Sequence, residues 1–145
     1  MIFKYKDVIS LDETLSPIIL AGLKKFKEEL IECKCGSYPA KMYELIGVGD
    51  MEPTIGQDEM AWQMWLEVID KMIYAFDQDE QPNMDFYDFD FVMDSFPTEE
   101  GFTRMSIDVT NQAEYDRFRE DENDWYEKCK EGRMLLSEYF DSLWL

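Results

Sequence analysis

Carboxylates are the side chains that this sequence offers in greatest number for chemistry. Its 145 residues include 33 Asp and Glu, 14 Lys and Arg and no histidine, so the formal net charge is −19. The segment Asp77-Gln-Asp-Glu-Gln-Pro-Asn begins like a calcium-binding loop, but Pro82 stands where such a loop requires glycine. Asp85, Asp88 and Asp90 bind a cation only if they converge, and alternation along a strand puts Asp88 and Asp90 on one solvent face. We therefore predict no metal site and no other cofactor.

The absence of histidine excludes most nucleophilic catalysis. A Ser-His-Asp or Cys-His site lacks its base, and a zinc site with histidine ligands is excluded as well. Cys33, Cys35 and Cys129 form an odd set that favours reduced thiols, and a metal bound by them would need a carboxylate as its fourth ligand. No phosphate-binding glycine loop, nucleophile elbow or dinucleotide motif is present. We predict that the protein is not an enzyme.

The negative charge is concentrated in the second part of the chain. Residues 1–49 hold seven basic and seven acidic side chains, whereas residues 50–145 hold seven basic and 26 acidic ones. Between Met72 and Thr103 there is no lysine or arginine. Direct binding of nucleic acid is excluded because it requires clustered cations. The concentrated carboxylates instead create a negative electrostatic field, which predicts a positively charged protein partner.

The predicted contact surface consists of acidic residues and two aromatic anchors. Trp62 and Trp125 fit the apolar stripes of their helices poorly, and an exposed tryptophan is a typical binding anchor. The acidic members are Asp77, Asp79, Glu80, Asp85, Asp88, Asp90, Glu99, Glu100, Glu120, Asp121, Glu122 and Asp124.

Three helices are predicted from apolar side chains that recur every three or four residues. They cover about residues 13–33, 58–77 and 111–143, with Pro17 tolerated in the first turn of the first helix. The clearest stripe lies in 58–77 and contains Trp62, Trp65, Leu66, Ile69, Met72, Ile73 and Phe76. A buried side of the last helix is predicted from Phe118, Trp125, Cys129, Leu136, Phe140 and Leu143. The glycine-rich connection 36–57 has room for a helical turn over 41–46.

A hairpin is predicted between the second and third helices. Phe89, Phe91 and Met93 alternate with aspartates, and Met105 and Ile107 continue the pattern after an acidic loop. The strands cover about 86–93 and 102–109. Two strands alone are marginally stable, so we expect their apolar face to pack on the helices. The pattern predicts an α+β fold forming one acidic domain over residues 1–145.

The sequence shows no membrane segment and no export signal. No stretch approaches the roughly 18 consecutive apolar residues that span a bilayer. The N-terminus, Met1-Ile-Phe-Lys-Tyr-Lys-Asp, lacks the apolar core of a signal peptide. We therefore expect the protein to reside in a cytoplasm.

Three blocks of helical pattern stand out in the sequence. The first contains Phe3-Lys-Tyr-Lys-Asp and Leu11-Asp-Glu-Thr-Leu-Ser-Pro, the second is Trp65-Leu-Glu-Val-Ile-Asp-Lys-Met-Ile-Tyr-Ala-Phe, and the third is Lys130-Glu-Gly-Arg-Met-Leu-Leu-Ser-Glu-Tyr-Phe-Asp-Ser-Leu-Trp. Together they resemble a family of small tailed-phage proteins of no assigned activity, with a Leu-Asp-x-Thr helix, a central Trp…Met-Ile-x-Ala-Phe helix and a closing Tyr-Phe-x-x-Leu-Trp. The blocks cover under half of the chain, and residues 78–110 do not match. The resemblance implies a phage protein that acts in the cytoplasm of a bacterial host.

Charge and resemblance together favour a non-enzymatic phage accessory protein that binds and inhibits a basic host protein. A nuclease or a CRISPR-type defence effector has a basic groove for nucleic acid, which a DNA-like acidic surface can block. Two alternatives stay open: a virion or assembly component, and a protein that sequesters a nucleotide signal. The second would use aromatic rings and a pocket formed by Lys24, Lys25, Lys27, Arg104, Arg117 and Arg119. A homodimer also stays open.

Overall fold

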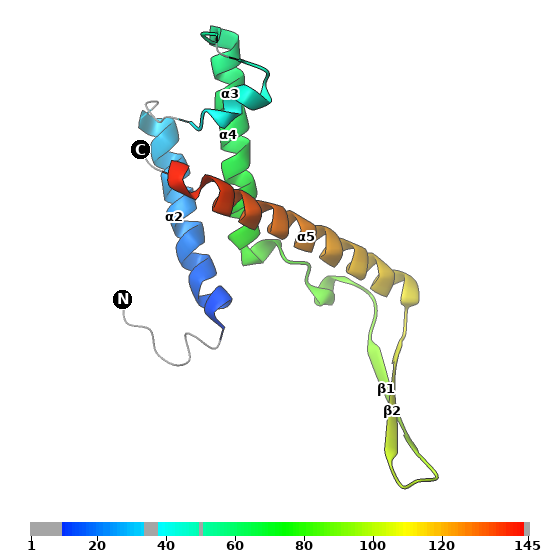
Figure 1. The fold of residues 1–145 in the computed structure, drawn as a ribbon. Coiled ribbons are helices and arrows are strands. Elements are labelled where there is room, and N and C mark those ends of the chain that lie inside the picture. Colours follow the sequence, from blue (N-terminus) through cyan, green and yellow to red (C-terminus); the bar gives the residue numbers. More distant parts are fainter. Residues whose placement is uncertain (1–9, 34–37, 50, 144–145) are drawn as a thin grey trace. The chain divides into compact units, whose positions relative to one another are not determined.

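The computed structural model describes residues 10–33, 38–49 and 51–143 (Figure 1). Cys35, the N-terminal block of the resemblance up to Ile9 and its closing Trp144 lie outside the described residues. Where the sequence predicts one domain, the contacts of the chain group into two compact units. We call Met1–Glu80 with Glu127–Leu145 the helical unit, and Gln81–Tyr126 the hairpin unit.

The helical unit contains α2 (Leu11–Cys33), α3 (Lys41–Leu45), α4 (Ile55–Phe76) and the second half of α5 (Gln112–Tyr139). Its core is formed by fully buried side chains from three helices: Leu30, Met42, Trp65, Ile69 and Met72. The predicted stripe of the second helix is thus confirmed at its centre, and α3 confirms the short helical turn predicted over 41–46.

Two of these helices begin earlier than predicted. α4 begins at Ile55, because the Thr54 hydroxyl accepts a hydrogen bond from the Gln57 amide and the Gln57 side chain accepts one from the Thr54 amide. α2 begins at Leu11, so Pro17 lies inside the helix, and its predicted place in the first turn is wrong. The preceding Ser16 hydroxyl donates a hydrogen bond to the Asp12 carbonyl at 2.7 Å.

The second half of α5 packs against α4 at a glycine. A Cβ atom placed on Gly132 would lie 2.1 Å from the Lys71 carbonyl oxygen, so no side chain fits between the two backbones there. α5 ends at Tyr139 and is followed by the 3₁₀ turn η3 (Phe140–Ser142). Tyr139 is buried, with its ring 5.5 Å from that of Trp65, whereas Phe140 is exposed. The predicted burial of Phe140 is therefore wrong, because the tighter turn changes which side chain faces the core.

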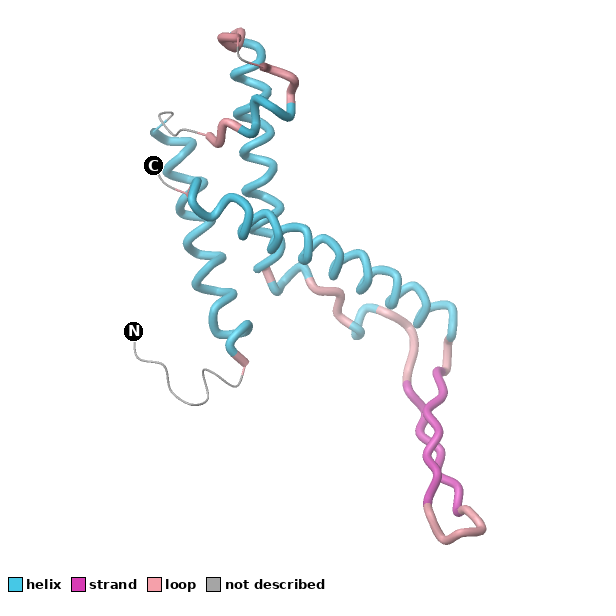
Figure 2. Tube along the Cα trace, in the orientation of Figure 1, coloured by secondary structure: helices cyan, strands magenta, loops and turns pink. Residues whose placement is uncertain are grey.

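The hairpin unit contains β1 (Phe91–Pro97), β2 (Thr103–Val109) and the first half of α5 (Figure 2). The strands are antiparallel, with Phe91 opposite Val109 and Met93 opposite Ile107. β1 begins five residues later than predicted, because Met84–Phe86 forms the 3₁₀ turn η2. This turn is stabilised by Asn83, whose side chain accepts a hydrogen bond from the Asp85 amide.

Apart from Phe91, which contacts Tyr115 of α5, the apolar face of the hairpin is not covered by the helices, contrary to the prediction. Every residue of β1 is exposed, and β2 is exposed except for two half-buried residues. Helices and a two-stranded antiparallel sheet nevertheless confirm the α+β class. Among the described residues, no helix is both long and apolar enough to cross a membrane.

Candidate protein-binding surface

An aromatic cluster holds the segment before β1 against the first half of α5. Phe89 is buried, and its ring lies 5.3 Å from that of Tyr115 and 5.7 Å from that of Phe118. Tyr87 contacts Phe118 edge-on at 5.2 Å, and Phe91 contacts Tyr115 at 5.8 Å. Such edge-to-face pairs add to the stabilisation from burial. This cluster therefore fixes residues 87–91 on the helix.

Polar contacts fix the same segment at both ends. The Tyr87 hydroxyl donates a hydrogen bond to the Asp121 carboxylate at 2.6 Å, which raises the pKa of Tyr87. The Arg117 guanidinium lies 4.9 Å from the centre of the Tyr87 ring. At the base of the hairpin, the Asp90 amide donates to the Thr110 hydroxyl at 2.8 Å, and the Thr110 amide donates to the Asp90 carbonyl at 3.0 Å.

This arrangement gathers carboxylates on the hairpin unit. Residues 81–126 contain 13 acidic side chains and 3 arginines, which leaves a net charge of −10. Among the described residues, the ion pairs of this unit are Arg117 with Glu114 and Arg119 with Glu122. The two paired glutamates are half-buried, and the other acidic side chains of the unit are all exposed. Most of the negative charge thus faces solvent without compensation.

α5 carries one regular row of these charges. Asp116, Glu120 and Asp124 recur at four-residue spacing and are all exposed, so they lie along one side of the helix at intervals of about 6 Å. Like charges at this spacing destabilise a helix slightly. B-DNA carries one phosphate per about 1.7 Å of its axis, so the row alone is more dilute than a duplex.

The predicted acidic residues are only partly brought together. The cluster places Asp88 and Asp90 beside the first half of α5, where the Asp88 amide is 3.4 Å from a Glu114 carboxylate oxygen. Asp85 precedes them in the 3₁₀ turn η2. The predicted helix members Glu120, Asp121, Glu122 and Asp124 lie on that same half of α5, whereas Glu99 and Glu100 lie in the turn between the strands. The predicted surface did not include Asp94, Asp108, Glu114 and Asp116, which belong to the same unit, although the four-residue spacing on α5 was a signal for Asp116.

Other predicted members belong to the helical unit. Asp77 forms an ion pair with Lys24 of α2 at 3.1 Å, which lowers the pKa of Asp77 and neutralises its charge locally. Asp79 and Glu80 lie in the exposed 3₁₀ turn η1 (Gln78–Glu80).

The two predicted tryptophan anchors are half-buried, so their predicted exposure is wrong. Trp62 packs near the core, with its ring 6.1 Å from that of Tyr38. Trp125 belongs to the hairpin unit, and its indole nitrogen is buried with no hydrogen-bond partner among the described residues. Part of each side chain is therefore covered by the fold, and only the remaining part is available to a partner.

The cationic pocket of the nucleotide alternative is not assembled on α2. Lys24 and Lys27 each pair with a carboxylate of the helical unit, Asp77 and Asp70, and Lys25 pairs with Glu28 and Glu29 of its own helix. Arg104, Arg117 and Arg119 belong to the hairpin unit, on β2 and α5.

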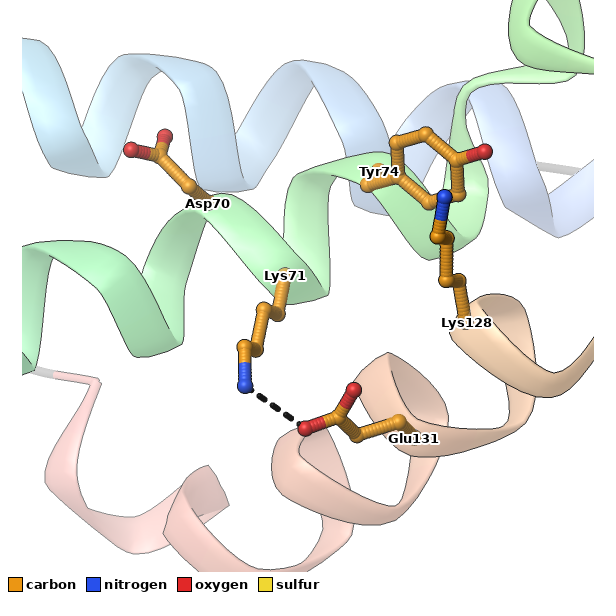
Figure 3. Close-up of a pocket in the computed structure, with 5 residues that line it drawn as sticks. All are labelled: Asp70, Lys71, Tyr74, Lys128 and Glu131. Carbon is orange, nitrogen blue, oxygen red and sulfur yellow. Dashed lines mark hydrogen bonds and ion pairs between the residues drawn. The ribbon is translucent and has the colours of Figure 1, made fainter. Parts of the chain in front are cut away.

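A cleft of about 400 Å³ lies instead between α4 and the second half of α5 (Figure 3). Its wall includes Tyr74, over which the Lys128 ammonium lies at 5.9 Å, and the ion pair of Lys71 with Glu131 at 2.7 Å. Asp70 completes the lining, so the wall contains two lysines and two carboxylates and has no net charge. Such a wall does not favour a phosphate.

The carboxylates do not assemble into a metal site in the part of the chain that the structure describes, where no group of three or more Cys, Asp or Glu could hold an ion. Asp88 and Asp90, which the prediction placed on a strand, precede β1. Comparisons of the chain with protein-family models, curated proteins and solved structures give no match.

Proposed function

We propose that this chain is a non-enzymatic phage accessory protein whose hairpin unit binds and inhibits a basic protein of the host, such as a nuclease or defence effector. The observation that supports the proposal is the exposed, uncompensated charge of −10 on residues 81–126. Carrying so many like charges opposes folding through self-repulsion, and a cationic partner relieves that cost.

Inhibition follows from competition for a cationic groove. A groove that binds nucleic acid displays lysine and arginine side chains to phosphates, and carboxylates satisfy the same cations. The row Asp116, Glu120 and Asp124 supplies such carboxylates from the side of α5 opposite Phe118. Asp88 and Asp90 supply further carboxylates from the segment that packs on the Phe118 side. The resemblance to tailed-phage proteins favours a bacterial cytoplasm as the place of action.

Affinity capture from nuclease-treated bacterial lysate tests this function. The bait variant changes Asp116→Asn, Glu120→Gln and Asp124→Asn, which removes three charges without changing side-chain size. The matched control changes exposed acids of the helical unit, Glu28→Gln, Glu59→Gln and Asp141→Asn. We expect wild type and control to retain a basic protein that the row variant loses.

Salt and nucleic acid then identify the mode of binding. We expect the captured protein to elute as ionic strength rises from low to physiological levels, because exposed charges are screened beyond about 8 Å at 0.15 M. We also expect DNA or RNA to compete with the chain for the purified partner. Capture that is insensitive both to salt and to the loss of the charge row would contradict the proposal.

A further inference from the structure

One face of the hairpin carries no charge and is open to solvent except at its base, where Phe91 contacts Tyr115 and Val109 is half-buried. Strand alternation and the observed register place eight residues on it: Phe91, Met93, Ser95, Pro97, Thr103, Met105, Ile107 and Val109. Met93, Met105 and Ile107 are 60%, 61% and 62% exposed. The opposite face is mixed, with Asp94, Arg104 and Asp108 between apolar residues. We call the first of these the uncharged face.

The uncharged face is bounded by carboxylates at both ends. Asp88 and Asp90 precede β1 at the base, and Glu99 and Glu100 lie in the turn that joins the strands. This turn is closed by Gly101 at φ +81° and by the Phe102 amide, which donates to the Thr98 hydroxyl. Seven strand residues span about 23 Å, so the uncharged face separates the two acidic ends by about that distance.

A second copy of the chain is a poor occupant of this face. Two strands are about 10 Å wide, so the face covers on the order of 230 Å², whereas a stable interface buries about 800 Å² on each partner. A larger contact between two copies would bring together two units that each carry −10. A cationic partner can extend the contact onto the flanking carboxylates, where a second copy meets repulsion.

We propose that the uncharged face is the docking surface for an extended segment of the cationic partner, with apolar residues in its centre and Lys or Arg at both ends. The inference rests on the proposed function and specifies the partner's chemistry. Each strand of a two-stranded sheet also has an open edge, at which an extended segment can form backbone hydrogen bonds. Apolar contact then supplies the specificity that charge alone does not.

Binding of two labelled peptides to the full chain tests the proposal. The first peptide alternates valine and threonine between two pairs of arginines, and the second has serine in place of each valine. Because burying several valines is favourable, we expect the valine peptide to bind about tenfold or more tightly. The variant Met93→Thr with Ile107→Thr is expected to abolish this difference. The control Val92→Thr with Phe96→Thr, on the opposite face, is expected to keep it.

A measurement on the wild-type chain avoids variants that disturb the hairpin. With methyl-labelled methionine, the valine peptide is expected to shift the NMR signals of Met93 and Met105 but not that of Met60, which is exposed on α4. Equal affinity for both peptides, with these signals unmoved, would overturn the docking face and leave the proposed function standing. If neither peptide bound, the docking proposal would fail, and the proposed function would be decided by the affinity capture and the competition with nucleic acid. Dimerisation abolished by the uncharged-face variant would assign the face to a second copy and overturn the inference.

Discussion

The helical unit and the hairpin unit bury their apolar side chains to very different extents. In the helical unit, Leu30, Trp65 and Met72 are completely buried, and ion pairs such as Lys27 with Asp70 join different helices. In the hairpin unit only Phe89 and Phe118 are buried, and the strands are exposed. One unit is therefore stabilised by its own core, whereas the other depends on a small aromatic cluster and carries the unbalanced charge. Regions of low local stability are those from which binding elements are commonly drawn.

The largest effect is expected from Trp65→Ala in the helical unit. Removal of this fully buried indole leaves a cavity and should lower the free energy of unfolding by about 3–5 kcal/mol. The indole nitrogen has no hydrogen-bond partner among the described residues, so the loss is one of packing. Denaturant unfolding followed by circular dichroism measures it, with the exposed Met60→Ala expected to change little. A small effect of Trp65→Ala would contradict the tight packing of Trp65 in the core of the helical unit.

Phe118→Ala is expected to destabilise the hairpin unit by about 3 kcal/mol, because its ring joins Tyr87 and Phe89 to α5. Amide hydrogen exchange should show loss of protection in β1 and β2, while amides of α2 and α4 stay protected. Equal loss of protection in α4 would show that the two units unfold together.

Gly132→Ala tests the contact between α4 and the second half of α5. The new methyl group would meet the Lys71 carbonyl at 2.1 Å and the Ala75 Cβ at 2.6 Å, so we expect a loss of about 1–3 kcal/mol. Gly22→Ala in α2 is the matched control, because nothing lies within 4 Å of its Cβ position. That control should gain about 0.5–1 kcal/mol from helix propensity. Thermal melting compares the two, and equal stability of both variants would contradict the close approach.

Asp77→Asn is expected to have the smallest effect. The pKa of Asp77 is lowered by its hydrogen bond with the Lys24 ammonium, so the pair stabilises the fold above the ordinary aspartate pKa of about 3.9. This stabilisation is lost as the pH falls through the lowered pKa. Because Lys24 is half-exposed, we expect less than about 1 kcal/mol at pH 7 and a smaller difference at pH 2. Urea unfolding at both pH values measures it against Asp79→Asn, and a difference that did not shrink between pH 7 and pH 2 would exclude the ion pair as its cause.

The sequence predicted those features that follow from local periodicity. The stripe through Trp65, Ile69 and Met72 located α4. The alternation of apolar and polar residues about Met93 and Ile107 predicted which strand residues share a face. The start of α4 was also readable, because Thr54 and Gln57 have the spacing of a capping box. The register of the hairpin follows from its turn, which is a local feature as well.

Features that depend on distant partners were not predictable in this way. Alternation shows which strand residues share a face but not what covers that face, so the exposure of Met93 and Ile107 was unexpected. The pairing of Tyr87 with Asp121 and of Lys24 with Asp77 joins residues 34 and 53 positions apart. For the same reason, the prediction placed Asp77 among the carboxylates available to a partner, although Asp77 is paired with Lys24. Composition alone does not distinguish a paired carboxylate from an unpaired one.

The helical unit is assembled from two stretches of chain with residues 81–126 inserted between them. During synthesis, α4 emerges from the ribosome well before Gly132, the residue that must fit against it. Until then, among the described helices, α4 can pack on α2 and α3, and the side of α4 that later meets Gly132 is uncovered. Loop-closure entropy grows slowly with length, so the insertion adds little to the final equilibrium cost. It mainly delays completion of the core, and a chain truncated before Gly132 should be the form most exposed to chaperones and proteases.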